Sequence, residues 1–208
     1  MKRGLFTVLF ALFAMVGFSQ VDVNVKTGIN FGSWMGENYG DMKFKPGFRV
    51  GVGIEYQFTD LLSLQPTLFF SQKGARDKYV AEVGEFEGEA KLKINEWYMD
   101  IPVNLQLRFE LSDKVNLLAA TGPYIGVGIG GKTKEKAESG KITIDEKSDT
   151  FGEDNLKRFD AGWGIGLGVE INRFQVGLDT QFGFCQLVRD VDNSPHNVNI
   201  GITVGYTF

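Results

Sequence analysis

The amino-acid sequence predicts an all-β fold, an eight-stranded antiparallel up-and-down transmembrane β-barrel that follows a cleaved signal peptide. Three observations predict it. The 208 residues include 27 glycines and only 5 prolines, so glycine reaches nearly twice its usual share of about 7%. Beyond Gln20 the apolar residues recur at every second position, which is the period of a β-strand. The connections between these segments alternate between short and long, as in a membrane barrel.

The chain begins with the features of a secretory signal peptide. Lys2 and Arg3 supply a positive end, residues 5–18 supply an apolar run, and Ser19 supplies a small residue. The alternative is an N-terminal membrane anchor, but the run is shorter than the roughly twenty residues that a spanning helix needs. We therefore expect export and cleavage after Ser19.

This cleavage site divides the chain into a signal peptide, residues 1–19, and one β-barrel domain with four external loops, residues 20–208. Loss of Lys2 and Arg3 changes the net charge from −4 to −6. No later stretch is apolar over the length of a spanning helix, so the mature chain is either soluble outside the cytoplasm or a membrane barrel. The acidic balance argues against a general nucleic-acid binder, which needs a basic footprint.

Each of the first four alternating segments has an apolar face and a polar face. Residues 23–32 set valine, isoleucine and phenylalanine against asparagine, lysine and glycine. Residues 48–58 set aromatic and β-branched residues against glycine, arginine, glutamate and glutamine. Residues 62–73 set leucine, proline and phenylalanine against serine, glutamine, threonine and lysine. Residues 96–110 set seven large apolar residues against mostly charged and amide side chains.

The last four segments repeat the pattern with more glycine on the polar face. Residues 115–129 and 158–171 set large apolar residues against glycine with a few charged, amide or tyrosine side chains. Residues 174–184 and 198–208 alternate in the same way and end in phenylalanine. Short turns are expected around three dipeptides: Thr59-Asp60, Ser112-Asp113 and Asn172-Arg173. The long connections are residues 35–46, 74–92, 131–157 and 190–197.

A soluble eight-stranded barrel, such as a lipocalin, is the alternative architecture. Its interior is only just wide enough for side chains, so the large apolar residues of all eight segments cannot fit inside. The apolar face must therefore look outward into lipid, and the small glycines must face inward. Two sets of aromatic residues support this orientation, because interfacial aromatics form a girdle at each membrane surface. At the turn end these are Tyr56, Phe58, Phe109, Phe174, Tyr206 and Phe208, and at the loop end Trp34, Phe48, Phe70, Trp97, Phe159 and Phe184.

Four stretches resemble the small outer-membrane β-barrel proteins often called PorT-like, and the resemblance covers the whole mature chain. The stretches are residues 97–105, 122–128, 159–170 and the terminal Tyr206-Thr207-Phe208. The resemblance implies a multi-pass protein of the bacterial outer membrane. It also implies contact with outer-membrane lipids and, through the C-terminal aromatic signal, with periplasmic chaperones and the barrel-assembly machinery. The family has no shared catalytic motif, and its name comes from a member tied to protein secretion.

One motif matches a phosphate-binding loop, since Gly126 to Thr133 satisfies G-x-x-x-x-G-K-[ST]. Such a loop also needs a following helix whose N-terminus faces the phosphates. Residues 133–140 contain only Ala137 as an apolar residue, so no amphipathic helix is expected. We interpret the motif as a glycine-alternating strand that enters a charged loop, and we expect no cofactor.

The only histidine, His196, and the only cysteine, Cys185, limit the possible chemistry. They exclude disulfides within the chain, cysteine-rich zinc sites and two-histidine metal sites. Asp192, Ser194 and His196 are close in sequence and could form a hydrolase triad in a loop, but the same residues are typical of a polar turn. We interpret Cys185 as a small strand residue. No catalytic or metal-binding residue is therefore predicted, and the ligand-binding residues are unknown.

Twelve charged residues are predicted to point into the barrel. Because an isolated charge in a narrow interior costs several kcal/mol, these charges must pair or meet water. They form either a salt-bridged plug or, as an alternative, a narrow polar path or ligand pocket. The residues are Lys26, Arg49, Glu55, Lys73, Glu96, Asp100, Arg108, Glu110, Arg158, Asp160, Glu170 and Asp179.

The two longest connections, residues 74–92 and 131–157, are rich in lysine and glutamate. Residues 132–158 contain seven basic and seven acidic residues, so we expect solvated extensions of the strands with no patch of a single sign. The leading hypothesis is a non-enzymatic structural, adhesion or partner-binding protein of the envelope. The alternatives are a narrow channel or small-ligand transporter, a secretion-associated component, and an enzyme whose catalytic residues lie in the loops.

Overall fold

The computed structural model describes residues 21–37, 42–83, 86–139, 142–151, 156–188 and 193–208, which form ten β-strands. The predicted signal peptide lies outside the described residues. The strands are β1 (Val21–Met35), β2 (Lys43–Gln57), β3 (Leu62–Lys73), β4 (Ala75–Val83), β5 (Phe86–Ser112), β6 (Val115–Ser139), β7 (Ile142–Asp149), β8 (Phe159–Ile171), β9 (Phe174–Gly183) and β10 (His196–Thr207).

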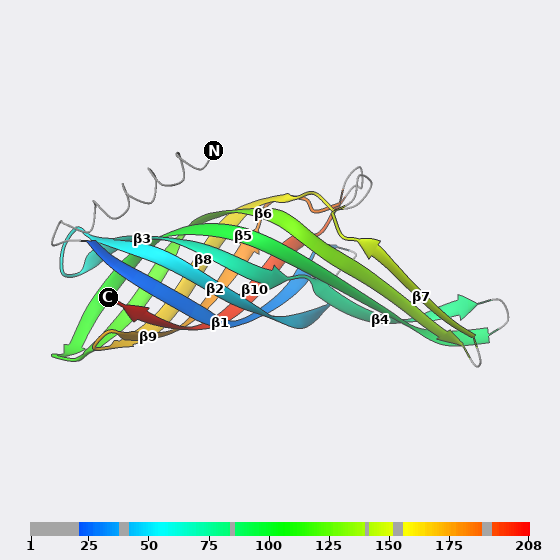
Figure 1. The fold of residues 1–208 in the computed structure, drawn as a ribbon, viewed down its shortest axis with the longest axis horizontal. Helices are drawn as coiled ribbons and strands as arrows, with labels where there is room; N and C mark the ends of the chain where they lie inside the picture. The colour runs from blue at the N-terminus through cyan, green and yellow to red at the C-terminus, as the bar shows by residue number, and fades with distance from the viewer. Residues whose placement is uncertain (1–20, 38–41, 84–85, 140–141, 152–155, 189–192) are drawn as a thin grey trace, which may run out of the picture.

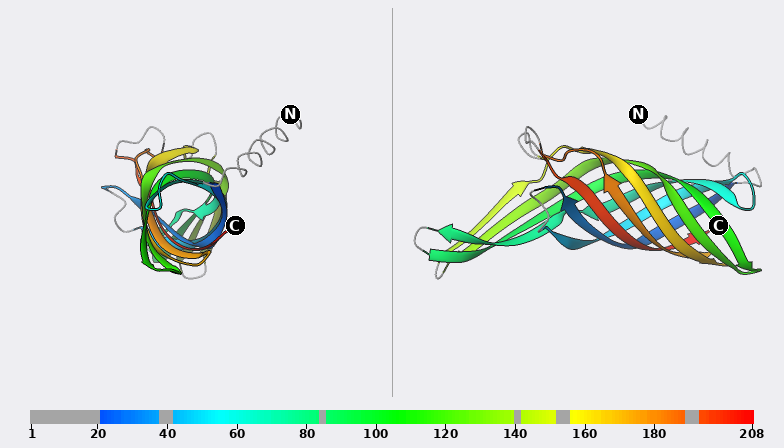
Figure 2. Two further views of the ribbon diagram at one scale, coloured as in Figure 1. Left: turned by 90° about the vertical axis from the view of Figure 1, so that its left-hand side faces the viewer. Right: turned by 180° about the vertical axis from the view of Figure 1, so that it is seen from behind.

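Eight of these strands close a ring in the order β1-β2-β3-β5-β6-β8-β9-β10, with every pair antiparallel. The ring is visible end-on in Figure 2. The first and last strands close it, with Asn24 opposite Thr207 and Met35 opposite His196. The predicted eight-stranded up-and-down barrel is confirmed, and each of the eight alternating segments lies in one strand of the ring.

The short turns are where the sequence predicts them. Thr59-Asp60 separates β2 from β3, and Asp113-Lys114 separates β5 from β6. Asn172, between β8 and β9, has a φ of 55°, a left-handed conformation that asparagine tolerates better than most residues. The first residues of β1 and the last residues of β10 lie at the same end of the barrel as these three turns. Val21 of β1 is opposite Tyr56, near the end of β2, and Asn24 is opposite Thr207, at the end of β10.

Two of the predicted external connections, residues 74–92 and 131–157, are largely β-structure, in agreement with their expected character as extensions of the strands. β5 and β6 contain 27 and 25 residues, more than twice the 9–11 or so that cross a membrane. Beyond the ring they pair with each other and with β4 and β7 in the order β4-β5-β6-β7. We call this four-stranded sheet, residues 75–95 and 131–149, the external sheet. Figure 1 shows it projecting from one end of the barrel.

The predicted faces of the barrel strands are confirmed. The apolar side chains of the alternating segments point outward: Ile29 is 51% exposed, Leu167 62% and Val176 52%. The aromatic residues of the turn-end girdle lie on this outer face, where Tyr56 contacts Phe58. At the loop end, the ring of Trp97 stacks on Phe70 and meets Phe48 edge-on. Within the described residues, no helix is long and apolar enough to cross a membrane.

Trp34 is an exception, and its assignment to the loop-end girdle was wrong. Its side chain is only 7% exposed and points into the barrel. The cause is its position in the alternation, because Asn30 and Gly32, at the same parity, are also buried. The indole N–H donates to Glu96 Oε1 at 2.9 Å, which a side chain in the lipid could not do.

Candidate functional site: a filled interior and an external sheet

The barrel interior is occupied by polar side chains in three layers between the turn end and the loop end. At the turn end, the Glu55 carboxylate is fully buried. It accepts hydrogen bonds from Ser63 Oγ at 2.7 Å, Arg108 Nη2 at 2.9 Å, and the amides of Gln65 and Gln106, both at 3.1 Å. A carboxylate has about four acceptor positions, and here three donors bond Oε1 and one bonds Oε2.

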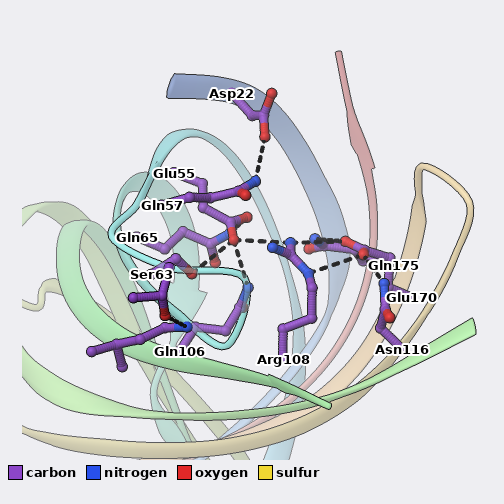
Figure 3. Close-up of polar contacts among 12 residues, drawn as sticks. Asp22, Glu55, Gln57, Ser63, Gln65, Gln106, Arg108, Asn116, Glu170 and Gln175 are labelled. Atoms are coloured by element: carbon purple, nitrogen blue, oxygen red, sulfur yellow. Dashed lines mark hydrogen bonds and ion pairs between the residues drawn. The ribbon is translucent and has the colours of Figure 1, made fainter. Parts of the chain in front are cut away.

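Arg108 connects this carboxylate to a second one on the opposite wall. Its Nε and Nη2 donate to the two oxygens of Glu170 at 3.1 and 3.2 Å, while Nη2 also reaches Glu55. Figure 3 shows the guanidinium of Arg108 between the two carboxylates. Asn116 and Gln175 donate to Glu170 at 2.8 Å each. Side chains from β2, β3, β5, β6, β8 and β9 thus cross the interior as one network.

The middle layer contains an ion pair and a small cavity. Both Nη atoms of Arg49 donate to the carboxylate of Asp179, and Lys26 donates to Gln65. A cavity of about 80 Å³ lies beside them, with Gly166 and Gly168 in its wall. Glycine makes room for the long side chain of Arg49 at Gly201, where an added Cβ would lie 2.4 Å from Cζ of Arg49.

The third layer lies toward the loop end. Lys73 Nζ donates to Asp100 Oδ1 at 2.8 Å, with both side chains buried. The ammonium lies 4.8 Å from the ring centre of Tyr98 and 5.0 Å from that of Tyr124, within the range of a cation–π interaction. Tyr124 in turn donates to Asp160 Oδ2 at 3.0 Å. The charge of Lys73 is therefore balanced by a carboxylate and by two aromatic faces.

An apolar cluster, here called the outer cap, covers this layer on the external side. It joins residues of β1, β4 and β5 to the segments that follow β7 and β9. Phe151 meets Tyr98 edge-on, with ring centres 5.6 Å apart. Alternation along the chain does not predict the outer cap, because the cap joins residues from Trp34 to Leu187 that are far apart in the sequence. The cap consists of Trp34, Ala75, Ile94, Tyr98, Phe151, Leu156 and Leu187.

Most of the predicted inward charges lie inside, where they are paired or hydrogen-bonded, as a plug requires. Two differ. Glu110 is exposed at the turn end, where it is opposite Asn116 in the last regular pair before the register shift. Arg158 is exposed at the loop end, where it donates to the carbonyls of Gly128 and Phe151. Lys45, absent from the prediction, is 3% exposed and donates to the carbonyl of Lys73 at 3.1 Å.

Of the residues in the alternative enzyme hypothesis, the described Ser194 and His196 each contact the main chain. His196 Nδ1 lies 3.1 Å from the carbonyl oxygen of Cys185, and Ser194 Oγ accepts from the Val188 N–H at 2.7 Å. Asp192 lies outside the described residues. The phosphate-loop motif is an interior part of β6, so no helix N-terminus follows it. In the part of the chain that the structure describes, no group of three metal-ligating side chains occurs.

Comparison with known proteins identifies relatives of this fold. Residues 14–189 match the family model described as the outer membrane protein beta-barrel domain. No curated protein matches. Similar solved structures include the attachment invasion locus protein Ail of Yersinia pestis (14% identity, TM-score 0.43, 91% of this chain and 99% of that one). OprG of Pseudomonas aeruginosa is also similar, with 11% identity and a TM-score of 0.47 over 92% of this chain and 98% of that one. Neisserial surface protein A has 14% identity and a TM-score of 0.41 over 89% of this chain and 97% of that one.

Proposed function

Because the chain belongs to the outer membrane protein beta-barrel domain family, and is therefore an integral protein of the bacterial outer membrane, we propose that it is a non-enzymatic envelope protein. In this proposal it displays the external sheet as a binding surface. The PorT-like resemblance places no further function on it. The barrel holds the sheet in position, and a partner outside the cell is bound by the sheet.

One observation carries this proposal: β5 and β6 run without interruption from the barrel wall into the external sheet. Register shifts occur in their pairing, between Trp97 and Tyr98 and between Glu110 and Ser112, but neither ends a strand. A binding surface made of such strands needs less ordering on contact than a flexible loop, which lowers the entropic cost of binding. β7 also leaves one of its edges without a partner strand in the described sheet, and open edges are pairing sites.

The test compares the full protein with a trimmed variant in which short turns replace residues 77–92 and 133–148. The cuts fall at the register pairs Arg76–Lys93 and Lys132–Asp149, so each remaining strand pair can be closed by a hairpin turn. On intact cells, a photoreactive residue at Lys147 should form a discrete macromolecular adduct. The same residue at Lys114, in a turn at the opposite end, is the matched control.

The trimmed variant should still migrate as a folded, heat-modifiable barrel, because β4 and β7 lie outside the ring. It should lose the external contact. If no position in the external sheet forms an adduct, and the trimmed cells adhere and grow like those with the full protein, the proposal is wrong.

A further inference from the structure

Four basic residues occupy one cross-strand row of the external sheet. Arg76 of β4 is opposite Lys93 of β5, Lys93 is opposite Lys134 of β6, and Lys134 is opposite Lys147 of β7. All four are exposed. We call them the basic row. Neighbouring strands are about 4.8 Å apart, so the row spans about 14 Å.

The next row outward is also mostly basic. It places Lys78, Lys91 and Lys136 opposite one another, and Asp145 of β7 is opposite Lys136. The intervening row, which points to the other side of the sheet, consists of Asp77, Leu92, Glu135 and Glu146. The expectation of no patch of a single sign was therefore wrong, because strand alternation separates the lysines from the glutamates that the overall count combines.

The basic row lies on the side of the sheet that continues the lipid-facing wall. Along β5, Lys93 has the same parity as the outward Trp97, whereas Ile94 and Tyr98 are buried. Lys93 is four residues beyond Trp97, which corresponds to about 13 Å along a strand and about 10 Å above the girdle for a tilt near 40°. The headgroup layer is about 5–8 Å thick on each side of the hydrocarbon core. Long basic side chains in this row therefore reach the headgroups.

The row is unfavourable without a counter-charge. Like charges directly opposite each other destabilise a sheet, and no ion pair involving these four side chains is found among the described residues. By contrast, Lys132, in the row nearest the barrel, lies 3.9 Å from Asp149. An extended array of negative charges at membrane height would relieve the repulsion between all four residues at once.

We propose that the basic row binds the phosphate groups of phosphorylated lipids in the outer leaflet of the membrane. The row and the outward lysines beside it form the site, and the ligand is a lipid headgroup that carries two or more phosphates. Such a contact anchors the base of the external sheet at the membrane surface. This inference does not depend on the external partner proposed above. K93Q/K134Q leaves the external sheet in place, so a loss of lipid A binding with an unchanged external adduct separates the two proposals.

The test measures lipid binding by the full protein in neutral detergent with native mass spectrometry. The probe is bis-phosphorylated lipid A, and its dephosphorylated form is the matched lipid. The variant K93Q/K134Q removes two charges from the row, while K114Q/R173Q removes two from the opposite end. Heat-modifiability first shows that both variants are folded. We expect K93Q/K134Q to bind lipid A about 30-fold more weakly, K114Q/R173Q to bind as the unmodified protein does, and K93R/K134R to retain binding.

Three results would overturn the assignment. The first is equal lipid A binding by the two glutamine variants. The second is equal binding of the dephosphorylated lipid by the unmodified protein. The third is binding of a soluble heparin fragment that exceeds that of lipid A and is lost in K93Q/K134Q, which would assign the row to an external polyanion. Inorganic phosphate at millimolar concentration should not displace lipid A, because a single phosphate cannot span the row.

Discussion

Glu55 shows, at the scale of one residue, how the interior charges hold the barrel together. Its carboxylate is fully buried and receives hydrogen bonds from four side chains of β3 and β5. Its removal would leave the buried donors of Ser63, Gln65 and Gln106 without this acceptor and Arg108 with Glu170 as its remaining carboxylate. Breaking a buried ionic network in this way is strongly destabilising. The sequence placed Glu55 on the inner face, but alternation cannot identify its partners, since Gln106 and Arg108 are 51 and 53 residues away in the chain.

We therefore predict that Glu55→Ala lowers the free energy of unfolding by about 3–5 kcal/mol. Urea titration of the protein in phospholipid vesicles measures it. Glu110→Ala is the control, since this carboxylate is exposed and its loss should change stability by no more than about 0.5 kcal/mol. Equal effects of the two substitutions would show that the Glu55 network does not stabilise the barrel.

Two glycines of β6, Gly128 and Gly130, allow the packing of the outer cap to be tested with the same substitution. An added Cβ at Gly128 would lie 2.3 Å from Cζ of Phe151, whereas nothing lies within 4 Å of one at Gly130. Gly128→Ala should therefore displace Phe151 and destabilise the protein by about 1–3 kcal/mol, the usual cost of overpacking. Gly130→Ala should leave stability unchanged or raise it by up to about 1 kcal/mol. Vesicle unfolding experiments measure both, and a larger loss at Gly130 would contradict this account of the cap.

At the scale of the element, successive side chains of a strand point to opposite faces of the sheet. In the barrel strands one face contacts lipid and the other faces the interior. In β9, Leu178 lies opposite Leu167 of β8 and Ile202 of β10, and it is 54% exposed on the outer wall. The same rule accounts for the buried Trp34 and for the basic row. Parity alone is therefore sufficient to place Trp34 and to separate the lysines from the glutamates within each connection. The row across four strands also needs their register.

The facing of β9 leads to a prediction about lipid contact. Leu178→Arg, near mid-strand, should cost about 2–4 kcal/mol of folding free energy in a bilayer. Leu111→Arg is the control, because Leu111 is 66% exposed but lies next to the β5–β6 turn, where an arginine costs about 0–1 kcal/mol. The measurement is reversible folding into vesicles. An unchanged stability for Leu178→Arg would mean that this face does not contact lipid.

At the scale of the whole molecule, the interior is blocked at several heights. The Glu55–Arg108–Glu170 network crosses the turn end, the Lys73–Asp100 pair crosses the loop end, and the outer cap lies above it. The cavity of about 80 Å³ between them is large enough for a few water molecules. This arrangement favours the plug over the channel hypothesis.

Planar-bilayer recordings test that interpretation directly. The unmodified protein should show no resolvable unitary currents, because each layer would have to break buried ion pairs to open. Protein-free membranes are the control for leakage. The variant R49S/D179S should also remain closed, since it enlarges only the central cavity and leaves both ends intact. Resolvable openings of the unmodified protein would instead support a channel.

The sequence by itself determined the class of fold, the eight barrel strands, their lipid-facing sides and the three short turns. These follow from a period of two and from local turn chemistry, which are properties of neighbouring residues. The tertiary structure decided the ion-pair partners, the outer cap and the external sheet, because each joins segments separated by tens of residues. Arg49 and Asp179, for example, meet only when the ring closes through β1 and β10. The basic row likewise exists only in the register of four strands, since the charges balance when they are counted along the chain.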